Sequence, residues 1–193
     1  MSKLTDTKLK INYKELEDVL ERQKKFDEYV MNKNEVEYNY YTFDQVKTSF
    51  IVELGEFLNE LPTLFKYWKP KAKDKRKEAL EEFADCLHFA MSLFYKVPEI
   101  KNHSYSPRLE RVYEDAYNTY YEAESISKGK KEIQPLNTMG LIIMDLDGNE
   151  GKILGDLLVL GGLVGFNWEE IYQAYVNKND KNYERQLNVE GYK

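Results

Sequence analysis

The stretch EEFADCLHF, residues 81–89, decides the fold because it opens a segment that is apolar on almost every side. Its apolar residues and those that follow recur at spacings of three and four, which indicates a helix. A helix that is apolar on most sides is buried inside its domain. Only Asp85, His88 and Ser92 interrupt the apolar surface, and they fall on one narrow stripe with Glu82 beside it. The sequence therefore predicts a central helix that carries a single polar stripe.

A second stretch, ELGEFLNELPTLFKYWK at residues 53–69, also places acids beside an apolar stripe. Glu53 and Glu56 are three residues apart, as are Glu82 and Asp85, and this spacing puts both side chains of a pair on one helix face. If the two acidic faces meet, four carboxylates converge, and their mutual repulsion raises their pKa values. A hard divalent ion such as Mg²⁺ relieves that repulsion. One such pair usually marks a solvated face, whereas two pairs beside apolar stripes support a metal site about as well as a solvated face.

The remaining segments also have the helical period, and only five prolines and ten glycines interrupt the chain. Gly140 to Met144, the stretch GLIIM, is the segment for which we also consider a strand. The expected helices begin at Asn12, Thr42, Ser106 and Asn167, with the central helix over about residues 75–96. The sequence predicts an all-α helical bundle. We expect one domain over residues 1–193, with residues 1–12 as a flexible N-terminal segment.

Composition and charge exclude several classes of protein. The net charge of −6 and the pI near 5.2 argue against a direct nucleic-acid binder, despite the basic loop at residues 66–77. Cys86 is the single cysteine, which indicates a reducing compartment. The longest apolar run, residues 153–166, falls short of the ~20 residues of a membrane span. We therefore expect a cytoplasmic protein with no membrane association.

Two other metal sites fit the sequence poorly. Di-iron bundles use a Glu-x-x-His pair from each of two helices. Here only Asp85 and His88 have that spacing, because the other histidine, His103, has Ile100 three residues before it. A calcium loop starting at residue 145 would need glycine at its sixth position and glutamate at its twelfth, which are Glu150 and Asp156 here.

Five segments, in order along the chain, resemble motifs of the dimeric all-α dUTPases, a family of the all-α nucleoside triphosphate pyrophosphatase superfamily. They are LERQKKFDEYV (20–30), the Glu53/Glu56 pair, FKYWK (65–69), EEFADCLHF (81–89) and YVNKNDKNYERQLNVEGY (175–192). The chain length and the first-helix motif resemble bacterial and phage members most.

This resemblance implies Mg²⁺-dependent hydrolysis of dUTP to dUMP and pyrophosphate, which limits uracil incorporation into DNA. It also implies the helical bundle of the superfamily and a homodimer. By the same resemblance Glu53, Glu56, Glu82 and Asp85 bind Mg²⁺, and Glu53 is the candidate general base. Use of dUDP as a second substrate is left open.

The resemblance also assigns the residues that bind substrate. They are Gln23, Lys66, Trp68, His88, Phe89, Lys178, Asn182, Arg185 and Tyr192. The amide of Gln23 suits the edge of uracil. Lys178, Asn182 and Arg185 share one helix face and suit phosphate oxygens. Lys69 and Phe26 depart from the family pattern, which often has Ser or Thr at the first position and Asn or Asp at the second.

Two alternatives stay open. One is a nucleoside triphosphate pyrophosphatase of broader specificity. The other is a phage dUTPase that also binds a repressor protein, for which a tyrosine-rich helix offers a surface. Its tyrosines, Tyr113, Tyr117, Tyr120 and Tyr121, would equally suit a dimer face or the core.

Overall fold

A computed structural model describes residues 9–37, 39–96, 105–126, 134–147 and 149–188. Its elements are α1 (Tyr13–Lys33), α2 (Tyr40–Asn59), a short 3₁₀ helix η1 (Pro62–Leu64), α3 (Arg76–Tyr95), α4 (Ser106–Ile126), α5 (Gln134–Asp145), α6 (Glu150–Leu163) and α7 (Trp168–Leu187). These ranges contain no strand, so the predicted all-α class is confirmed.

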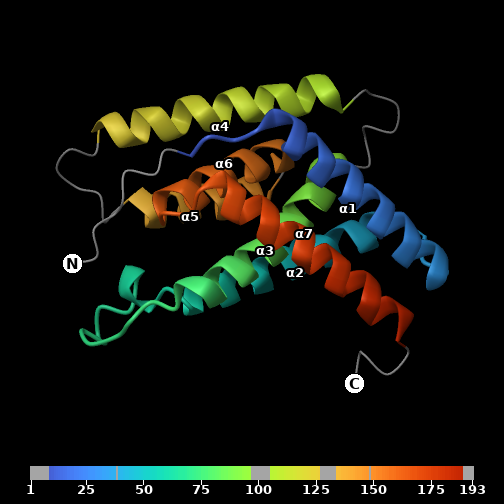
Figure 1. Cartoon of the computed structure of the whole chain (residues 1–193), viewed down its shortest axis with the longest axis horizontal. Coiled ribbons are helices and arrows are strands. Elements are labelled where there is room, and N and C mark those ends of the chain that lie inside the picture. Colours follow the sequence, from blue (N-terminus) through green and yellow to red (C-terminus); the bar gives the residue numbers. More distant parts are fainter. Residues whose placement is uncertain (1–8, 38, 97–104, 127–133, 148, 189–193) are drawn as a thin grey trace.

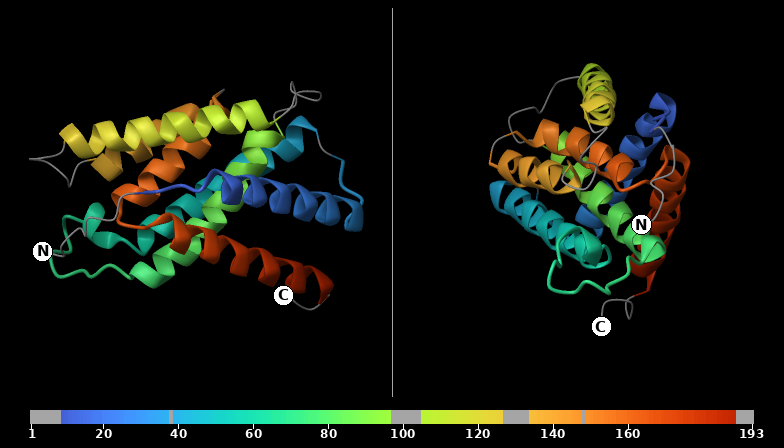
Figure 2. Two further views of the ribbon diagram at one scale, coloured as in Figure 1. Left: turned by 45° about the horizontal axis from the view of Figure 1, so that its top comes forward. Right: turned by 90° about the vertical axis from the view of Figure 1, so that its left-hand side faces the viewer.

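Helix α3 lies at the centre of the bundle, as its apolar sequence predicts. It packs against α1, α2, α6 and α7, and Figure 1 shows it crossing the molecule between α2 and α7. Figure 2 shows that α4 lies on the side of the bundle away from α2, where it packs against α6. Most of α3 from Ala79 to Phe94 is buried. This position brings the polar stripe of α3 against three other helices.

Glycines in α6 allow its close approach to the core. A Cβ atom on Gly161 would lie 2.7 Å from Cζ of Phe83 and 3.1 Å from Cδ1 of Ile171. Phe83 and Ile171 are both fully buried. The backbone of α6 therefore packs directly on side chains of α3 and α7.

The N-terminal ends of α1 and α7 are capped by the residues that the sequence predicts, Asn12 and Asn167. Oδ1 of Asn12 accepts a hydrogen bond from the Lys14 amide at 3.1 Å. Asn167 and Glu170 form the complete capping box. Glu15 does not complete a box at α1, because its Oε2 accepts a hydrogen bond from Nε1 of Trp168 at 2.5 Å. That bond links the first turn of α1 to the start of α7.

Three features differ from the sequence-based expectation. The cap of α2 is Asn39, whose Oδ1 accepts from the Thr42 amide at 3.1 Å, so the helix begins before Thr42. Gly140 to Met144, for which a strand was considered, lies within α5. Leu9 and Ile11 are buried, although we assigned them to a flexible segment.

The tyrosine-rich helix α4 contributes to the core. Tyr120 is buried against α6, where a Cβ on Gly162 would lie 2.6 Å from its ring. The ring of Tyr113 packs edge-on against Tyr13. Tyr120 is therefore unsuited to a partner surface, whereas the side chains of Tyr117 and Tyr121 lie outside the description.

The apolar run of residues 153–166 covers most of α6, whose side chains are largely buried in the core. Across the described ranges, no helix combines the length and the apolar character that a bilayer crossing requires. The thiol of Cys86 is buried in α3.

Candidate active site

The structure brings together three of the four predicted metal ligands. Glu53 projects from α2, and Glu82 and Asp85 project from α3. One carboxylate oxygen from each lies within 4.8 Å of the other two. We call these three residues the carboxylate cluster. They meet because α2 and α3 pack together along their apolar stripes, and each acidic pair flanks such a stripe.

Glu56 lies beside this cluster but outside the 4.8 Å group. Its side chain is exposed. Its charge still raises the pKa of Glu53, Glu82 and Asp85, so the carboxylate lies close enough to act on all three. Glu56 therefore adds to the negative charge of the cluster from an exposed position.

Burial makes the negative charge of the carboxylate cluster costly. It raises the pKa of Glu53 to about 7, and the charges of Asp85, Glu56 and Glu82 add to the rise. Burial also raises the pKa values of Glu82 and Asp85. Lys178 opposes these shifts, because its ammonium is ion-paired with Asp85. The carboxylate cluster thus has the charge and the need for a counterion that the sequence predicts.

The donor set fits a hard divalent cation. Carboxylate oxygens on two neighbouring helices are the ligands that Mg²⁺ prefers, and Mg²⁺ completes its shell with water. The three residues converge on one point, and Glu56 is near. No histidine or thiolate of the described chain joins the group, so its chemistry differs from that of a zinc site.

One helical turn beyond Asp85, His88 enters a buried polar network. Its Nδ1 lies 2.5 Å from Oε1 of Gln23. Because an amide oxygen only accepts, Nδ1 carries the proton and Nε2 of the neutral ring is an acceptor. Burial, with the charge of Lys178, lowers the pKa of His88 to about 3, which keeps the ring neutral.

Asp27 fixes the orientation of the Gln23 amide. Nε2 of Gln23 donates to Oδ1 of Asp27 at 2.9 Å and to Oγ of Ser92 at 3.2 Å. The hydroxyl of Tyr175 lies 3.0 Å from Oε1 of Gln23. Both amide hydrogens and the amide oxygen therefore have partners inside the protein. Gln23, predicted to contact uracil, here holds His88.

The Asp27 carboxylate is itself held by several donors. It accepts hydrogen bonds from Ser92 Oγ and Tyr95 OH, both at 2.7 Å. It also forms a 2.9 Å ion pair with Lys96, in which both side chains are little exposed. This network joins α1 to α3 next to the carboxylate cluster.

Two buried polar atoms near this network have no hydrogen-bond partner among the described residues. They are Nε2 of His88, an acceptor, and Nδ2 of Asn179, a donor. The His88 ring stacks on Tyr175 at 4.3 Å between centroids, and Asn179 follows Tyr175 by one turn of α7. Such buried, unpaired atoms are rare in native proteins and point to a ligand or water.

A comparison with protein-family models gives the match that the geometry leads us to expect. The model described as dUTPase matches residues 15–192, which is almost the whole chain. The chain belongs to the dUTPase family. The predicted family and its activity, hydrolysis of dUTP, are thereby confirmed, together with the all-α fold. A comparison with curated proteins gives no match.

The other residues predicted to bind substrate in this dUTPase differ in their exposure and in their contacts. Phe89 is half-buried on α3, next to the buried His88. Trp68 is exposed in the segment after η1, where it packs edge-on against Phe65 and Tyr67. Nζ of Lys66 donates to Oδ1 of Asn59 at 2.6 Å.

On α7 of this dUTPase, Lys178 reaches the carboxylate cluster directly. Arg185 is exposed and donates to Oδ1 of Asn182 at 3.4 Å, and its charge lowers the pKa of Asp85. Of these three α7 residues, Lys178 contacts the cluster, Arg185 acts on it through its charge, and Asn182 is bonded to Arg185. Tyr192, the remaining predicted substrate residue, lies outside the described ranges.

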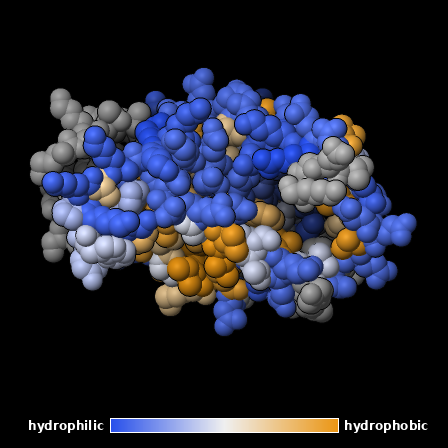
Figure 3. Space-filling view, turned by 90° about the horizontal axis from the view of Figure 1, so that it is seen from below, coloured by the Kyte–Doolittle hydropathy of each residue, from blue (hydrophilic) through white to orange (hydrophobic). Residues whose placement is uncertain are grey.

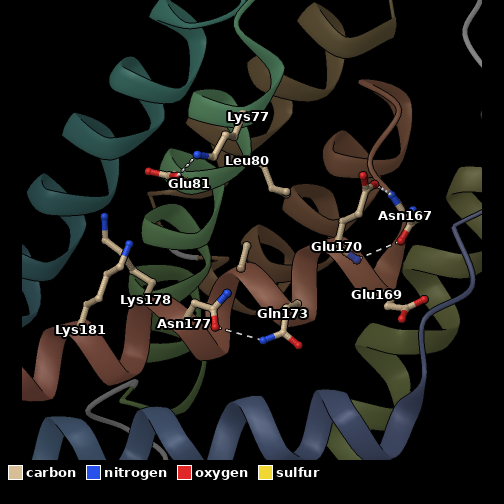
Figure 4. A pocket seen from close by; sticks show the side chains of 11 residues that line it. Lys77, Leu80, Glu81, Asn167, Glu169, Glu170, Gln173, Asn177, Lys178 and Lys181 are labelled. Atoms are coloured by element: carbon tan, nitrogen blue, oxygen red, sulfur yellow. Dashed lines mark hydrogen bonds and ion pairs between the residues drawn. The ribbon is translucent and has the colours of Figure 1, made fainter.

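A pocket of about 470 Å³ lies beside the carboxylate cluster, between α3 and α7. Figure 4 shows Lys178 and Lys181 projecting next to each other from α7 at one end of it. Lys77 of α3 also lines the pocket. Lys178 therefore belongs both to the wall of the pocket and to the carboxylate cluster.

Sequence reasoning missed several residues of this candidate site. Asp27 lies one turn after Gln23, and this i, i+4 spacing could have indicated their pairing. Ser92 was recognised on the polar stripe of α3, but without a partner. Asn179 sits in a polar stretch of α7, and nothing in the local pattern distinguishes it from its exposed neighbours.

Proposed function

We propose that this dUTPase requires Mg²⁺, held by Glu53, Glu82 and Asp85 with Glu56 beside them, and so limits uracil incorporation into DNA. The support is the convergence of three carboxylate oxygens from α2 and α3 within 4.8 Å. When bound there, Mg²⁺ would neutralise the phosphate charge of the nucleotide. The protein residues then bind the nucleotide, position the water and accept its proton.

Glu53 is our candidate for the general base. In the metal-free protein, burial raises the pKa of Glu53 to about 7. Bound Mg²⁺ would lower that pKa, so that the carboxylate is ionised and can accept a proton. Water adds at phosphorus while the bond between the α- and β-phosphates breaks. The proton of the water passes to Glu53, and dUMP and pyrophosphate leave.

We assign recognition of the uracil base to His88 and Asn179. Uracil presents an N–H donor at N3 and a carbonyl acceptor at O4. Nε2 of His88 is an unpaired acceptor and Nδ2 of Asn179 is an unpaired donor, so the two complement that edge. Cytosine has an acceptor at N3 and a donor at N4, and it would leave both protein atoms unsatisfied. Gln23 acts here through His88.

We assign phosphate binding to Lys178, Asn182 and Arg185, which share one face of α7. Arg185 offers a fork of donors and Lys178 a point charge. Lys66 and Trp68, in the segment after η1, would add contacts from the other side. The charges of both Lys178 and Arg185 act on Asp85, which supports their place next to the metal.

A nucleotide panel tests this function. The purified protein should release pyrophosphate from dUTP with Mg²⁺, and much more slowly from dCTP, dTTP and UTP. Turnover should stop with EDTA. Equal turnover of all four would instead support the broader pyrophosphatase. The panel repeated with Asn179→Ala should show weaker preference for dUTP over dCTP, whereas Asn118→Ala, an exposed change on α4, should not.

A homodimer is the assembly typical of the family, and we propose that it uses apolar residues of α5. Ile143 and Met144 are 57% and 75% exposed, and Leu141 is also exposed. Figure 3 shows one face of the molecule, which is largely hydrophilic with one hydrophobic patch. Exposed apolar residues that cluster are typical of interaction surfaces. Ile143→Asp with Met144→Asp should give a monomer in sedimentation velocity, while Asn137→Asp should not. A dimer that persists in the double variant would reject this interface.

A further inference from the structure

Lys178 acts on the whole carboxylate cluster. Its ammonium is ion-paired with Oδ2 of Asp85, and the two side chains are only 17% and 12% exposed. Its charge also lowers the pKa values of Glu53 and Glu82, against the effect of burial. One lysine of α7 is therefore an internal counterion for acids from two other helices.

This ion pair occupies a carboxylate oxygen of Asp85 that a metal ion would need as a ligand. A divalent cation bound by Asp85 would lie within a few ångströms of the Lys178 ammonium, and the two positive charges would repel strongly at this shielded site. Lysine has a flexible four-carbon stem, so its ammonium can move without a change in the helix.

The pocket between α3 and α7 gives that ammonium a place to go. Lys178 lines this pocket as well as contacting Asp85, and Lys77 and Lys181 line it too. In Figure 4 the side chains of Lys178 and Lys181 run in the same direction. Lys77 is ion-paired with Glu81 at 3.9 Å, and Glu169 and Glu170 also line the pocket. Lys178 and Lys181 therefore form its basic end, where two neighbouring ammonium groups repel one another unless an anion lies between them.

We propose that Lys178 and the divalent cation compete for Asp85, so that metal binding displaces the ammonium toward this pocket, where the phosphates of the nucleotide pair with it. The inference rests on the proposed function, because it takes the carboxylate cluster as the metal site. The cation alone must break the Lys178–Asp85 pair and therefore binds weakly. An anion that pairs with Lys178 favours the displaced position, so cation and nucleotide each strengthen the binding of the other.

Direct metal titration without nucleotide tests the competition. Free Mn²⁺ is measured by electron paramagnetic resonance as MnCl₂ is added to EDTA-treated, dialysed protein. Lys178→Met, which keeps the length of the side chain and removes its charge, should bind Mn²⁺ roughly 10-fold more tightly than the unaltered protein. Lys178→Arg keeps the charge and should not gain affinity. Lys181→Met removes a charge from the same pocket, but Lys181 is not among the main charges that shift the pKa values of the cluster. The Mn²⁺ affinity of Lys181→Met should therefore stay within about 2-fold of that of the unaltered protein.

Circular dichroism shows whether each variant folds, and Lys178→Gln replaces Lys178→Met if the latter does not. Unchanged or weaker Mn²⁺ binding in the charge-removing variant would overturn the competition. An equal gain in Lys181→Met would also overturn it, because a general loss of charge would then suffice. If neither the unaltered protein nor any variant binds Mn²⁺, the metal site of the proposed function fails, and the competition fails with it.

Discussion

Nδ1 of His88 lies 2.5 Å from Oε1 of Gln23, and this contact determines which nitrogen of the imidazole is left as an acceptor. Asp27 keeps the amide in this orientation, because its carboxylate can only accept from the amide nitrogen. The two helices α1 and α3 thus set the hydrogen-bonding character of an atom that we assign to base recognition.

Gln23→Glu should reverse that character. A carboxylate beside His88 would raise the pKa of His88 from about 3, and the doubly protonated ring would donate from Nε2. We expect kcat/KM for dUTP to fall roughly 100-fold and the preference over dCTP to shrink. Nitrogen chemical shifts of His88, recorded in a His103→Asn background, would report the change. An unchanged preference between the two nucleotides would contradict this role of His88.

Removing the buried carboxylate of Asp27 should destabilise the fold. Asp27→Ala removes the carboxylate that accepts hydrogen bonds from Ser92 and Tyr95 and that forms the little-exposed ion pair with Lys96. We expect the free energy of unfolding in urea to fall by about 3 kcal/mol. The matched control is Glu21→Ala, which removes a more exposed pair with Lys24 and should cost less than about 1 kcal/mol. Similar costs for the two variants would show that the Asp27 network adds little.

Two glycine substitutions should have opposite effects on stability. A Cβ at Gly161 would lie 2.7 Å from Phe83, which is fully buried, so Gly161→Ala should cost about 1–3 kcal/mol. No atom lies within 4 Å of a Cβ at Gly140 in α5. Gly140→Ala should therefore stabilise the helix by about 0.5–1 kcal/mol. Thermal melts of both variants test the packing of α6, and a neutral Gly161→Ala would contradict it.

The stability of the EDTA-treated protein should depend on pH through Glu53. The pKa of Glu53 is about 7 in the fold, compared with about 4.5 in an unfolded chain. Between these values the folded protein binds more protons, so this group makes stability fall as pH rises from about 4.5 to about 7. Metal binding, which needs the ionised carboxylate, should strengthen over the same range.

Glu53→Gln removes the loss of stability that ionisation of Glu53 causes. At pH 8 in EDTA the variant should be more stable than the unaltered protein by about 1–2 kcal/mol, a value below the full shift because the carboxylate is only partly buried. Below pH 4.5 the two should be equally stable. Urea denaturation at several pH values measures the difference, and a variant that is less stable at pH 8 would show that the Glu53 charge is well compensated in the fold.

The sequence predicts the acidic part of this site better than the base-recognition part. Glu53, Glu82 and Asp85 flank apolar stripes, and burial of those stripes forces their neighbours together, so helical spacing suffices. The partners of Gln23 depend on which side-chain conformations fit between α1, α3 and α7. Helical period places Gln23 on the right face, but it does not show that Asp27 and His88 fill its hydrogen bonds.

Other features depend on packing that no local pattern shows. The stretch at Gly140 to Met144 has strand-forming residues, but contact with α6 selects the helix α5. The ion pair of Lys178 with Asp85 joins residues far apart in the chain, and phosphate binding was the only role that the sequence suggested for Lys178. Asn179 was missed because only its burial distinguishes it from the exposed polar residues of α7.

The most direct test of the account is pyrophosphate release from dUTP by Glu82→Gln at saturating Mg²⁺, with Glu78→Gln as control. Glu78 is exposed one turn earlier on α3, outside the carboxylate cluster. We predict that Glu82→Gln keeps its helical circular dichroism and loses activity by at least about 1000-fold, while Glu78→Gln behaves as the unaltered protein. A folded Glu82→Gln protein with full activity would contradict the claim that these carboxylates form the catalytic metal site.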